Sequence, residues 1–288
     1  MLVDATALEL PGLRTVRTLT VLGDSIGVGV GDPAAGGGWR GFAPLLAQAT
    51  GATELVNLAF NGARVGCVRR RQLPAALRSR PDAVILVVGI NDSMRSDFDG
   101  DQIRADLDHV VGRLIAIGAM VVTVRYHDHA RVFRLPGPLR RLLRSRIGQL
   151  NAAVDEVAAR YRIGVVDLDR MPGAYERPTW AVDRLHPSEL GHRMLARQFA
   201  DRLVDAGAAM PGEVSLVCAG GREITGFHHV LWLVFKGIPW LWRRGQDLVP
   251  YALMTMLRAV FTDRPESGAE TTADSGFEAG LEPTPEQT

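Results

Sequence analysis

Short apolar runs alternate along this chain with longer segments whose apolar residues recur every three or four positions. The run from Ala83 to Val88 is apolar at every position, which is typical of a strand buried on both faces of a sheet. Runs of this kind predict five strands, at residues 18–22, 55–58, 83–88, 120–124 and 164–167.

The segments between these runs predict helices. One helical face carries five apolar residues, which are Ile103, Leu107, Val110, Val111 and Leu114. Residues 139–160 and 188–203 predict two more helices, and Ser188 is positioned to cap the second one after Pro187. Alternating strands and helices predict an α/β fold, a three-layer α/β/α sandwich around a five-stranded parallel sheet. Ligands of such folds bind at the carboxyl ends of the strands.

A serine and a histidine with a nearby carboxylate occur at such strand-to-loop junctions. Ser25 follows the first predicted strand in Gly23-Asp24-Ser25, and Asp183-Arg184-Leu185-His186 precedes the last helix. A serine hydroxyl needs a base to become nucleophilic. A histidine can act as that base when a carboxylate fixes its tautomer. Asp183 is close enough in sequence to reach the imidazole of His186 within one loop turn, so the three residues predict an ester hydrolase.

Two other junctions carry Gly62 and the segment Gly89-Ile90-Asn91-Asp92. An asparagine amide can stabilise a developing negative charge without titrating, and a glycine without Cβ lets a backbone amide approach that charge closely. Asp92 is expected to anchor its loop. The segment Gly23–Gly27 also fits G-x-S-x-G, the nucleophile elbow of α/β-hydrolases. In that fold the elbow usually follows a central strand deep in the sequence, whereas here it follows the first strand.

The four blocks, in this order, resemble the SGNH, or GDSL, hydrolase family over about residues 16–206. The resemblance implies a flavodoxin-like five-stranded sheet and an esterase or lipase with neither metal nor cofactor. Its substrate would be a small-molecule acyl ester, and the family's range includes lipid esters, thioesters and acetylated sugars.

The resemblance also implies a role for each residue. Ser25 would attack the acyl carbon, His186 would accept its proton, and Asp183 would orient His186. The backbone N–H groups of Ser25 and Gly62, with the Asn91 amide, would form the oxyanion hole. Two alternatives stay open: an acyltransferase that uses the same triad, and a membrane- or partner-binding protein with an inactive hydrolase core.

Two further motifs are weaker. The segment from Gly29 to Ala34 fits the dinucleotide fingerprint G-x-G-x-x-A, but Pro33 lies where the phosphate-binding helix would run. We therefore expect residues 27–41 to form a mobile rim beside Ser25. The sequence His127-Asp128-His129 could suggest a metal site, but no third and fourth ligand is evident, and a substrate rim or solvated loop is the favoured interpretation.

Composition narrows the function classes. The chain has 288 residues, of which 47% are hydrophobic, enough for one sizeable core and an additional segment. Its formal net charge of +1 gives no reason to expect a nucleic-acid partner. The two cysteines, Cys67 and Cys218, have no metal-site spacing. We see no signal peptide and no apolar run of membrane-spanning length, so a cytoplasmic location is expected.

The pattern divides the chain into three parts. Residues 1–208 are expected to form the catalytic domain, residues 209–262 a Trp-rich amphipathic appendage, and residues 263–288 a disordered acidic tail. Tryptophans beside basic residues within 228–262 suit peripheral contact with a membrane surface. Docking of this segment onto the catalytic domain or a second subunit is an equal alternative. Arginines near residues 69–71 and 131–146 are expected on solvated faces, with recognition of an anionic group as the alternative.

Overall fold

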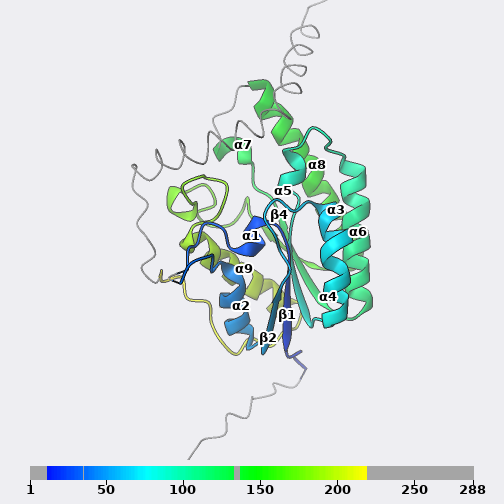
Figure 1. The fold of residues 1–288 in the computed structure, drawn as a ribbon, viewed down its shortest axis with the longest axis vertical. Coiled ribbons are helices and arrows are strands. Elements are labelled where there is room, and N and C mark those ends of the chain that lie inside the picture. The colour runs from blue at the N-terminus through cyan, green and yellow to red at the C-terminus, as the bar shows by residue number, and fades with distance from the viewer. Residues whose placement is uncertain (1–11, 35, 133–136, 219–288) are drawn as a thin grey trace, which may run out of the picture.

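Five parallel strands form one sheet in the computed structural model, which describes residues 12–34, 36–132 and 137–218 (Figure 1). The strands are β1 (Thr18–Gly23), β2 (Glu54–Asn57), β3 (Ala83–Val87), β4 (Met120–Arg125) and β5 (Gly164–Asp167). The five predicted strands are thus confirmed, with ends that differ by one residue at most.

The order of the strands, β2-β1-β3-β4-β5, determines where a ligand can bind. The chain passes from β1 to β2 on one side of the sheet and then returns to build β3, β4 and β5 on the other side. The reversal lies between β1 and β3, and the crevice beyond the carboxyl ends of two such strands is the usual ligand site of open α/β sheets. Ser25 follows β1 and Asn91 follows β3, so both predicted site residues lie at this reversal.

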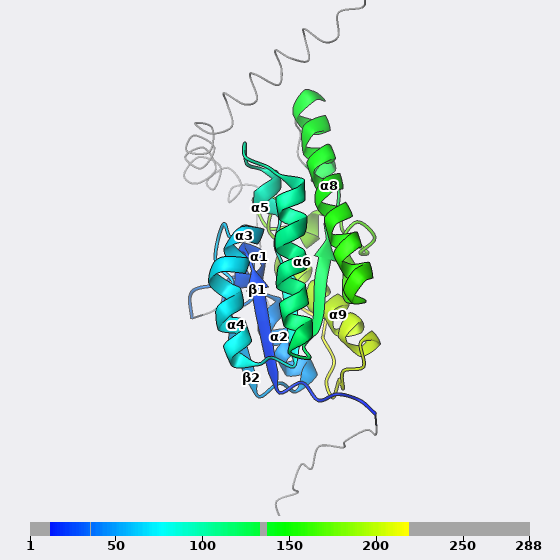
Figure 2. The ribbon, with the colours of Figure 1, turned by 90° about the vertical axis from the view of Figure 1, so that its right-hand side faces the viewer.

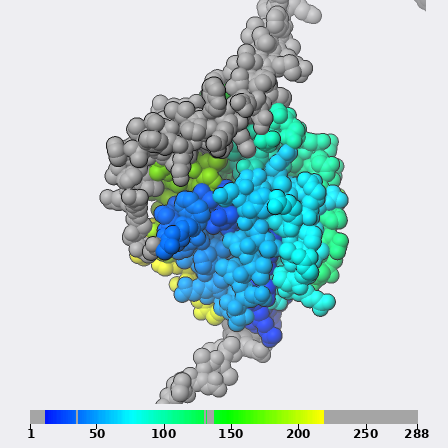
Figure 3. Space-filling view, in the orientation of Figure 1, coloured from blue at the N-terminus to red at the C-terminus, as the bar shows by residue number. Residues whose placement is uncertain are grey.

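Helices cover both faces of the sheet, which confirms the three-layer prediction (Figures 1 and 2). One layer contains α2 (Phe42–Thr50) and α9 (Glu189–Asp205), which pack against each other. The other contains α6 (Gly100–Ala116) and α8 (Gly137–Tyr161), with α3 (Val65–Cys67), the π-helical segment η1 (Val68–Gln72) and α4 (Leu73–Ser79) beside them. Residues of α2 to α4, blue to cyan in Figure 3, form much of the face seen in that view.

Short helical segments follow the strands at the carboxyl end of the sheet. They are α1 (Ser25–Val28), α5 (Ile90–Ser93), α7 (His129–Val132) and the 3₁₀ turn η2 (Arg177–Thr179). The segments α1, α5 and α7 follow β1, β3 and β4, and η2 lies between β5 and α9. Residues from distant parts of the chain therefore meet at one edge of the sheet (Figure 1).

Burial follows the hydrophobic pattern. Every residue of β3 is buried, whereas the edge strands β2 and β5 have one buried residue between them. The five apolar residues of the predicted helical face in α6 are all buried, as expected. Ser188 caps α9, since its hydroxyl accepts a hydrogen bond from the Gly191 N–H at 3.2 Å.

Part of the segment assigned to the appendage packs on the catalytic layers. The Ala209 N–H bonds to the Arg14 carbonyl and the Gly212 N–H bonds to the Ala49 carbonyl, while Val214 is buried. The rest of the predicted appendage and the whole acidic tail lie in residues 219–288, outside the described residues. None of the helices within the described ranges combines the length and apolar character that a membrane span needs.

Candidate active site

The turn after β1 presents Ser25 at the edge of the sheet. Gly23 has φ of +139°, and a Cβ there would lie 1.9 Å from the Val87 carbonyl oxygen, so only glycine fits where β1 and β3 meet. The Asp24 carboxylate caps α1 by accepting a hydrogen bond from the Ile26 N–H at 3.0 Å. Because Asp24 is the cap, the hydroxyl of Ser25 is left to face the loop that carries His186.

The loop before α9 holds Asp183 and His186. The Oδ1 atom of Asp183 accepts hydrogen bonds from the N–H groups of Leu185 and His186, at 2.9 and 3.0 Å. Its Oδ2 atom lies 2.5 Å from Nδ1 of His186, and Nε2 of His186 lies 2.8 Å from Oγ of Ser25. The structure therefore brings together three predicted residues, although Ser25 and His186 are 161 positions apart in the sequence.

The carboxyl group of Asp183 is held in its ionised form. Its burial alone would raise its pKa, but the hydrogen bonds from His186 and from the backbone outweigh this, and its pKa is below the ordinary value. An ionised carboxylate on Nδ1 requires that nitrogen to carry a proton, which leaves Nε2 of His186 as an acceptor toward Ser25.

Gly62 and Asn91 lie on the same edge of the sheet. Gly62 has φ of +77°, and a Cβ there would meet nothing within 4 Å. Glycine is therefore favoured at position 62 because the backbone there is left-handed, and not because a side chain would lack space. The side-chain amide of Asn91 donates to the Ala63 carbonyl at 3.1 Å and lies 3.4 Å from Oδ2 of Asp24. Asn91 thus connects the loop of Gly62 with the turn of Ser25.

Asp92 anchors this loop, as expected. Its carboxylate is buried and accepts hydrogen bonds from the Val65 N–H at 3.1 Å and from Nε of Arg64 at 3.2 Å. The segment that follows Gly62 is therefore fixed against α5, the element that carries Asn91.

Asp24 is a buried residue of the site that was not among the predicted site residues. Its side chain has no solvent exposure, and this burial raises its pKa to about 7, with the neighbouring Asp92 adding a smaller contribution in the same direction. The sequence signal was available, because an aspartate between a strand end and a short helix is a preferred N-cap.

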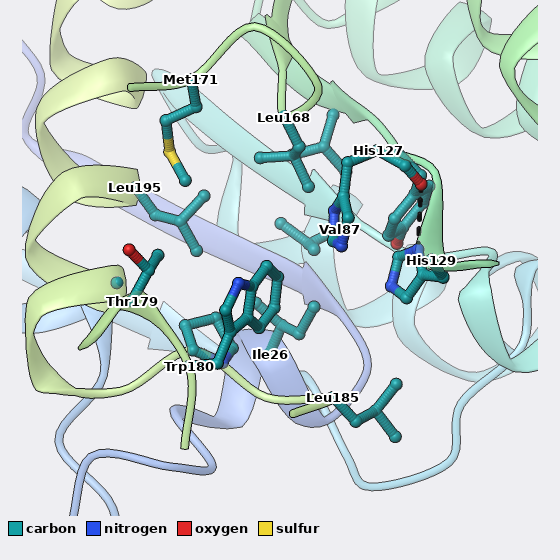
Figure 4. A pocket seen from close by; sticks show the side chains of 14 residues that line it. Ile26, Val87, His127, His129, Leu168, Met171, Thr179, Trp180, Leu185 and Leu195 are labelled. Atoms are coloured by element: carbon teal, nitrogen blue, oxygen red, sulfur yellow. Dashed lines mark hydrogen bonds between the residues drawn. The ribbon is translucent and has the colours of Figure 1, made fainter. Parts of the chain in front are cut away.

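A pocket is lined in part by chain neighbours of Ser25 and His186 (Figure 4). Ile26 adjoins Ser25, and Leu185 and Pro187 flank His186 in sequence, and all three line the pocket. The remaining lining is largely apolar, and it includes Val87, Val124, Leu168, Met171, Trp180 and Leu195. In this conformation the pocket has room for about one water-sized group, and the wider empty space of about 450 Å³ includes space that is open to solvent.

His127 and His129 also line this pocket, and the expectation of a solvated loop for them is wrong. Their exposed fractions are 1% and 2%; Tyr175 and Trp180 pack against the ring of His127, and Tyr126 and His127 pack against the ring of His129. Burial lowers the pKa of His127 to about 2 and that of His129 to about 4, so both rings are neutral at physiological pH. Among the described residues, no group of three or more metal-ligating side chains occurs.

An ion-pair cluster links the described part of the predicted rim, residues 27–34 and 36–41, to α9. Arg40 bonds Asp32 through Nε and Nη2, both at 2.9 Å, and its Nη2 also lies 2.7 Å from Glu189. Glu189 is the first residue of α9, so the cluster links the rim to the helix that follows His186. The glycines here follow a helix of four residues, α1, instead of opening the long helix that a dinucleotide site requires.

Most described arginines of the basic segments lie on exposed faces, as expected; they are Arg70, Arg71, Arg131, Arg140, Arg141 and Arg144. Arg69 pairs with Asp106 at 2.6 Å, and Arg144 pairs with Asp128 at 2.7 Å. Arg146 is buried and donates to backbone carbonyls of Ser93 and Arg95, so it does not belong to a solvated face.

Solved structures share this fold. An α/β hydrolase, LAE5, from the metagenome of Lake Arreo in Spain has 22% identity and a TM-score of 0.53, over 65% of this chain and 95% of that one. A lipase/acylhydrolase from Enterococcus faecalis has 21% identity and a TM-score of 0.53, over 66% and 96%. A variant of an acetyl xylan esterase from Geobacillus stearothermophilus has 22% identity and a TM-score of 0.52, over 65% and 94%. At such identities the likeness concerns the fold.

A comparison of the sequence with protein families identifies the family of this chain. Comparison with curated proteins found no significant match. Residues 21–194, more than half of the chain, match the GDSL-like lipase/acylhydrolase family, and this span includes every predicted site residue from Ser25 to His186. The chain therefore belongs to the GDSL-like lipase/acylhydrolase family and is an ester-hydrolysing enzyme.

Proposed function

We propose that this enzyme hydrolyses carboxylic esters through an acyl intermediate on Ser25. One observation carries the proposal: the imidazole of His186 bridges Asp183 and Ser25, with contacts of 2.5 and 2.8 Å. This is the geometry that a general base needs to take the proton of a serine nucleophile.

The reaction follows from these contacts. Nε2 of His186 accepts the hydroxyl proton as Oγ of Ser25 bonds to the acyl carbon, and Asp183 stabilises the imidazolium that forms. The imidazolium then gives its proton to the leaving alcohol, and the ester C–O bond breaks. In the second step His186 takes a proton from water as the water oxygen bonds to the acyl carbon. The imidazolium then returns this proton to Oγ of Ser25 as the acyl C–Oγ bond breaks, which releases the acid and restores Ser25.

Three donors are proposed to stabilise the oxyanion. They are the backbone N–H groups of Ser25 and Gly62 and the side-chain amide of Asn91. Neither of the two backbone N–H groups has an acceptor among the described residues, which leaves both available for substrate. The Asn91 amide donates to the carbonyl of Ala63, the residue after Gly62, which supports this role, and its longer contact with Asp24 at 3.4 Å is weak enough to be exchanged for the oxyanion.

Single and double substitutions test this proposal. Residues that act as one catalytic unit are not additive, so Ser25→Ala, His186→Ala and the double variant should each lower kcat for p-nitrophenyl acetate by a similar factor, about 10⁴ or more. Cys67→Ala is the matched control, because this half-buried thiol is a second nucleophile in the same half of the chain and should be dispensable. A Ser25→Ala variant with wild-type activity would refute the proposal.

A further inference from the structure

The imidazole of His127 has two polar atoms that the fold leaves unused. Neither Nδ1 nor Nε2 has a hydrogen-bond partner among the described residues, and both atoms are buried. A neutral imidazole always presents one N–H donor and one bare acceptor. Leaving both nitrogens unpaired in the interior costs free energy, and buried polar groups are nearly always paired. The two unpaired nitrogens of His127 therefore indicate a partner that binds there.

The ring is held firmly by its faces. It stacks on His129 with a centroid distance of 3.9 Å and an interplanar angle of 22°, and it contacts Trp180 at 4.7 Å. His129 is fixed in turn, because its Nδ1 lies 3.0 Å from the backbone carbonyl of His127. These neighbours hold the ring in one orientation while providing no hydrogen bond to either nitrogen.

His127 borders the pocket beside the nucleophile. Figure 4 shows its imidazole projecting into the space that His129, Leu168 and Trp180 surround. Ile26 and Leu185 line the same pocket and are the chain neighbours of Ser25 and His186, so this pocket is where we place part of an ester bound at Ser25. Both nitrogens are buried although the residue lines the pocket, so pairing with them takes a side-chain movement of the kind that commonly accompanies binding.

The chemistry of the pocket selects an uncharged group. Its lining is largely apolar and supplies no counter-charge to an ion, which would therefore lose its hydration without compensation. The neutral state of His127 agrees with this, because burial lowers the pKa of His127 to about 2. A hydroxyl or a carbonyl oxygen can pair with a neutral imidazole and fit among apolar side chains.

We propose that His127 is a specificity-determining residue, which recognises an uncharged hydroxyl or carbonyl group of the ester close to the scissile bond. This inference rests on the proposed function, since it places the group on an ester bound at Ser25. It predicts that the enzyme prefers oxygenated esters, such as those of hydroxy acids or polyols, to plain alkyl esters.

The test compares matched esters with and without a hydroxyl. On the acyl side, the substrates are p-nitrophenyl butyrate and p-nitrophenyl 3-hydroxybutyrate. On the alcohol side, they are butyl acetate and the 1-monoacetate of butane-1,3-diol, followed by pH-stat titration. The quantity measured is the ratio of kcat/KM for the hydroxylated and the plain ester. Comparing this ratio between enzyme variants cancels the intrinsic reactivity of each ester.

Two substitutions of His127 separate recognition from packing. His127→Phe keeps an aromatic ring for stacking and removes both nitrogens, and His127→Gln keeps a donor and an acceptor. We expect the ratio to fall by about tenfold in the Phe variant, the upper range for one neutral hydrogen bond, and to be largely kept in the Gln variant. His109→Phe, on α6, is the control and should leave the ratio unchanged.

The two pairs of esters and the wild-type control give results that can be told apart. A loss of preference on one side identifies whether the acyl or the alcohol part occupies the pocket. An unchanged ratio on both sides in His127→Phe overturns the inference alone, and is the result expected if His127 merely pairs with a buried water. A wild-type enzyme that hydrolyses none of the four esters and is not labelled by a fluorophosphonate overturns the proposed function, and this inference with it.

Discussion

The buried carboxyl group of Asp24 should make the stability of this enzyme depend on pH in a direction opposite to that of most aspartates. Burial raises its pKa to about 7, from an ordinary value of 3.8 in the unfolded chain. Between these values the folded protein holds a proton that unfolding releases. The stabilisation from Asp24 is therefore complete below about pH 4 and is lost as pH rises through 7.

The size of the effect follows from the two pKa values. Each pKa unit corresponds to about 1.4 kcal/mol, so the step from 3.8 to about 7 corresponds to about 4 kcal/mol. Asp24→Asn removes this titration and keeps a side-chain oxygen for the cap on the Ile26 N–H. The free energy of unfolding of the variant, relative to wild type, should therefore increase by about 4 kcal/mol between pH 4 and pH 8.

Urea unfolding followed by circular dichroism, at half-unit steps over this range, measures the difference. Asp97→Asn is the matched control, because Asp97 is exposed and a hydrogen bond from Arg64 lowers its pKa. Its removal should change the pH dependence only slightly and with the opposite sign. If the wild-type and Asp24→Asn curves stay parallel from pH 4 to pH 8, Asp24 does not titrate in the folded protein in that window, and the reasoning is refuted.

Three further substitutions give predictions at or near the active site. Asn91→Ala should lower kcat for p-nitrophenyl acetate by about 10²–10³, because it removes one oxyanion donor, and a loss below threefold would contradict that role. Gly62→Ala should lower the free energy of unfolding by about 1 kcal/mol, because the backbone of Gly62 is left-handed while the space around it is open. Urea unfolding measures this free energy, and an unchanged value would mean that the turn adjusts to the alanine. His127→Phe should raise the free energy of unfolding by about 1 kcal/mol, because it removes two unpaired buried nitrogens, and a lower midpoint in the same assay would show that they are satisfied in solution.

The hydrophobic pattern predicts the fold well because the sheet is central and parallel. Strand β3 is buried on both faces and reads as an unbroken apolar run, so its position follows from sequence alone. The edge strand β2 is short and largely exposed, and its ends were predicted one residue too late.

The site residues near strand ends could be predicted from the sequence. The burial and protonation of other residues could not, because these depend on long-range packing. The juxtaposition of Ser25 and His186 follows from the α/β topology, since both are at the carboxyl edge of the sheet. The burial of His127 does not follow from local pattern, because it depends on a loop some fifty positions later that brings Trp180 over the ring. The raised pKa of Asp24 depends in the same way on long-range packing.

The central claim is that Ser25 is an activated nucleophile, and covalent trapping tests it most directly. The purified enzyme is treated with a fluorophosphonate, and its intact mass and the modified peptide are recorded beside those of Ser25→Ala and Cys67→Ala. The account predicts one adduct on wild type and on Cys67→Ala, located on Ser25, and none on Ser25→Ala. An adduct that persists in Ser25→Ala, or an enzyme that hydrolyses esters without any adduct on Ser25, would contradict it.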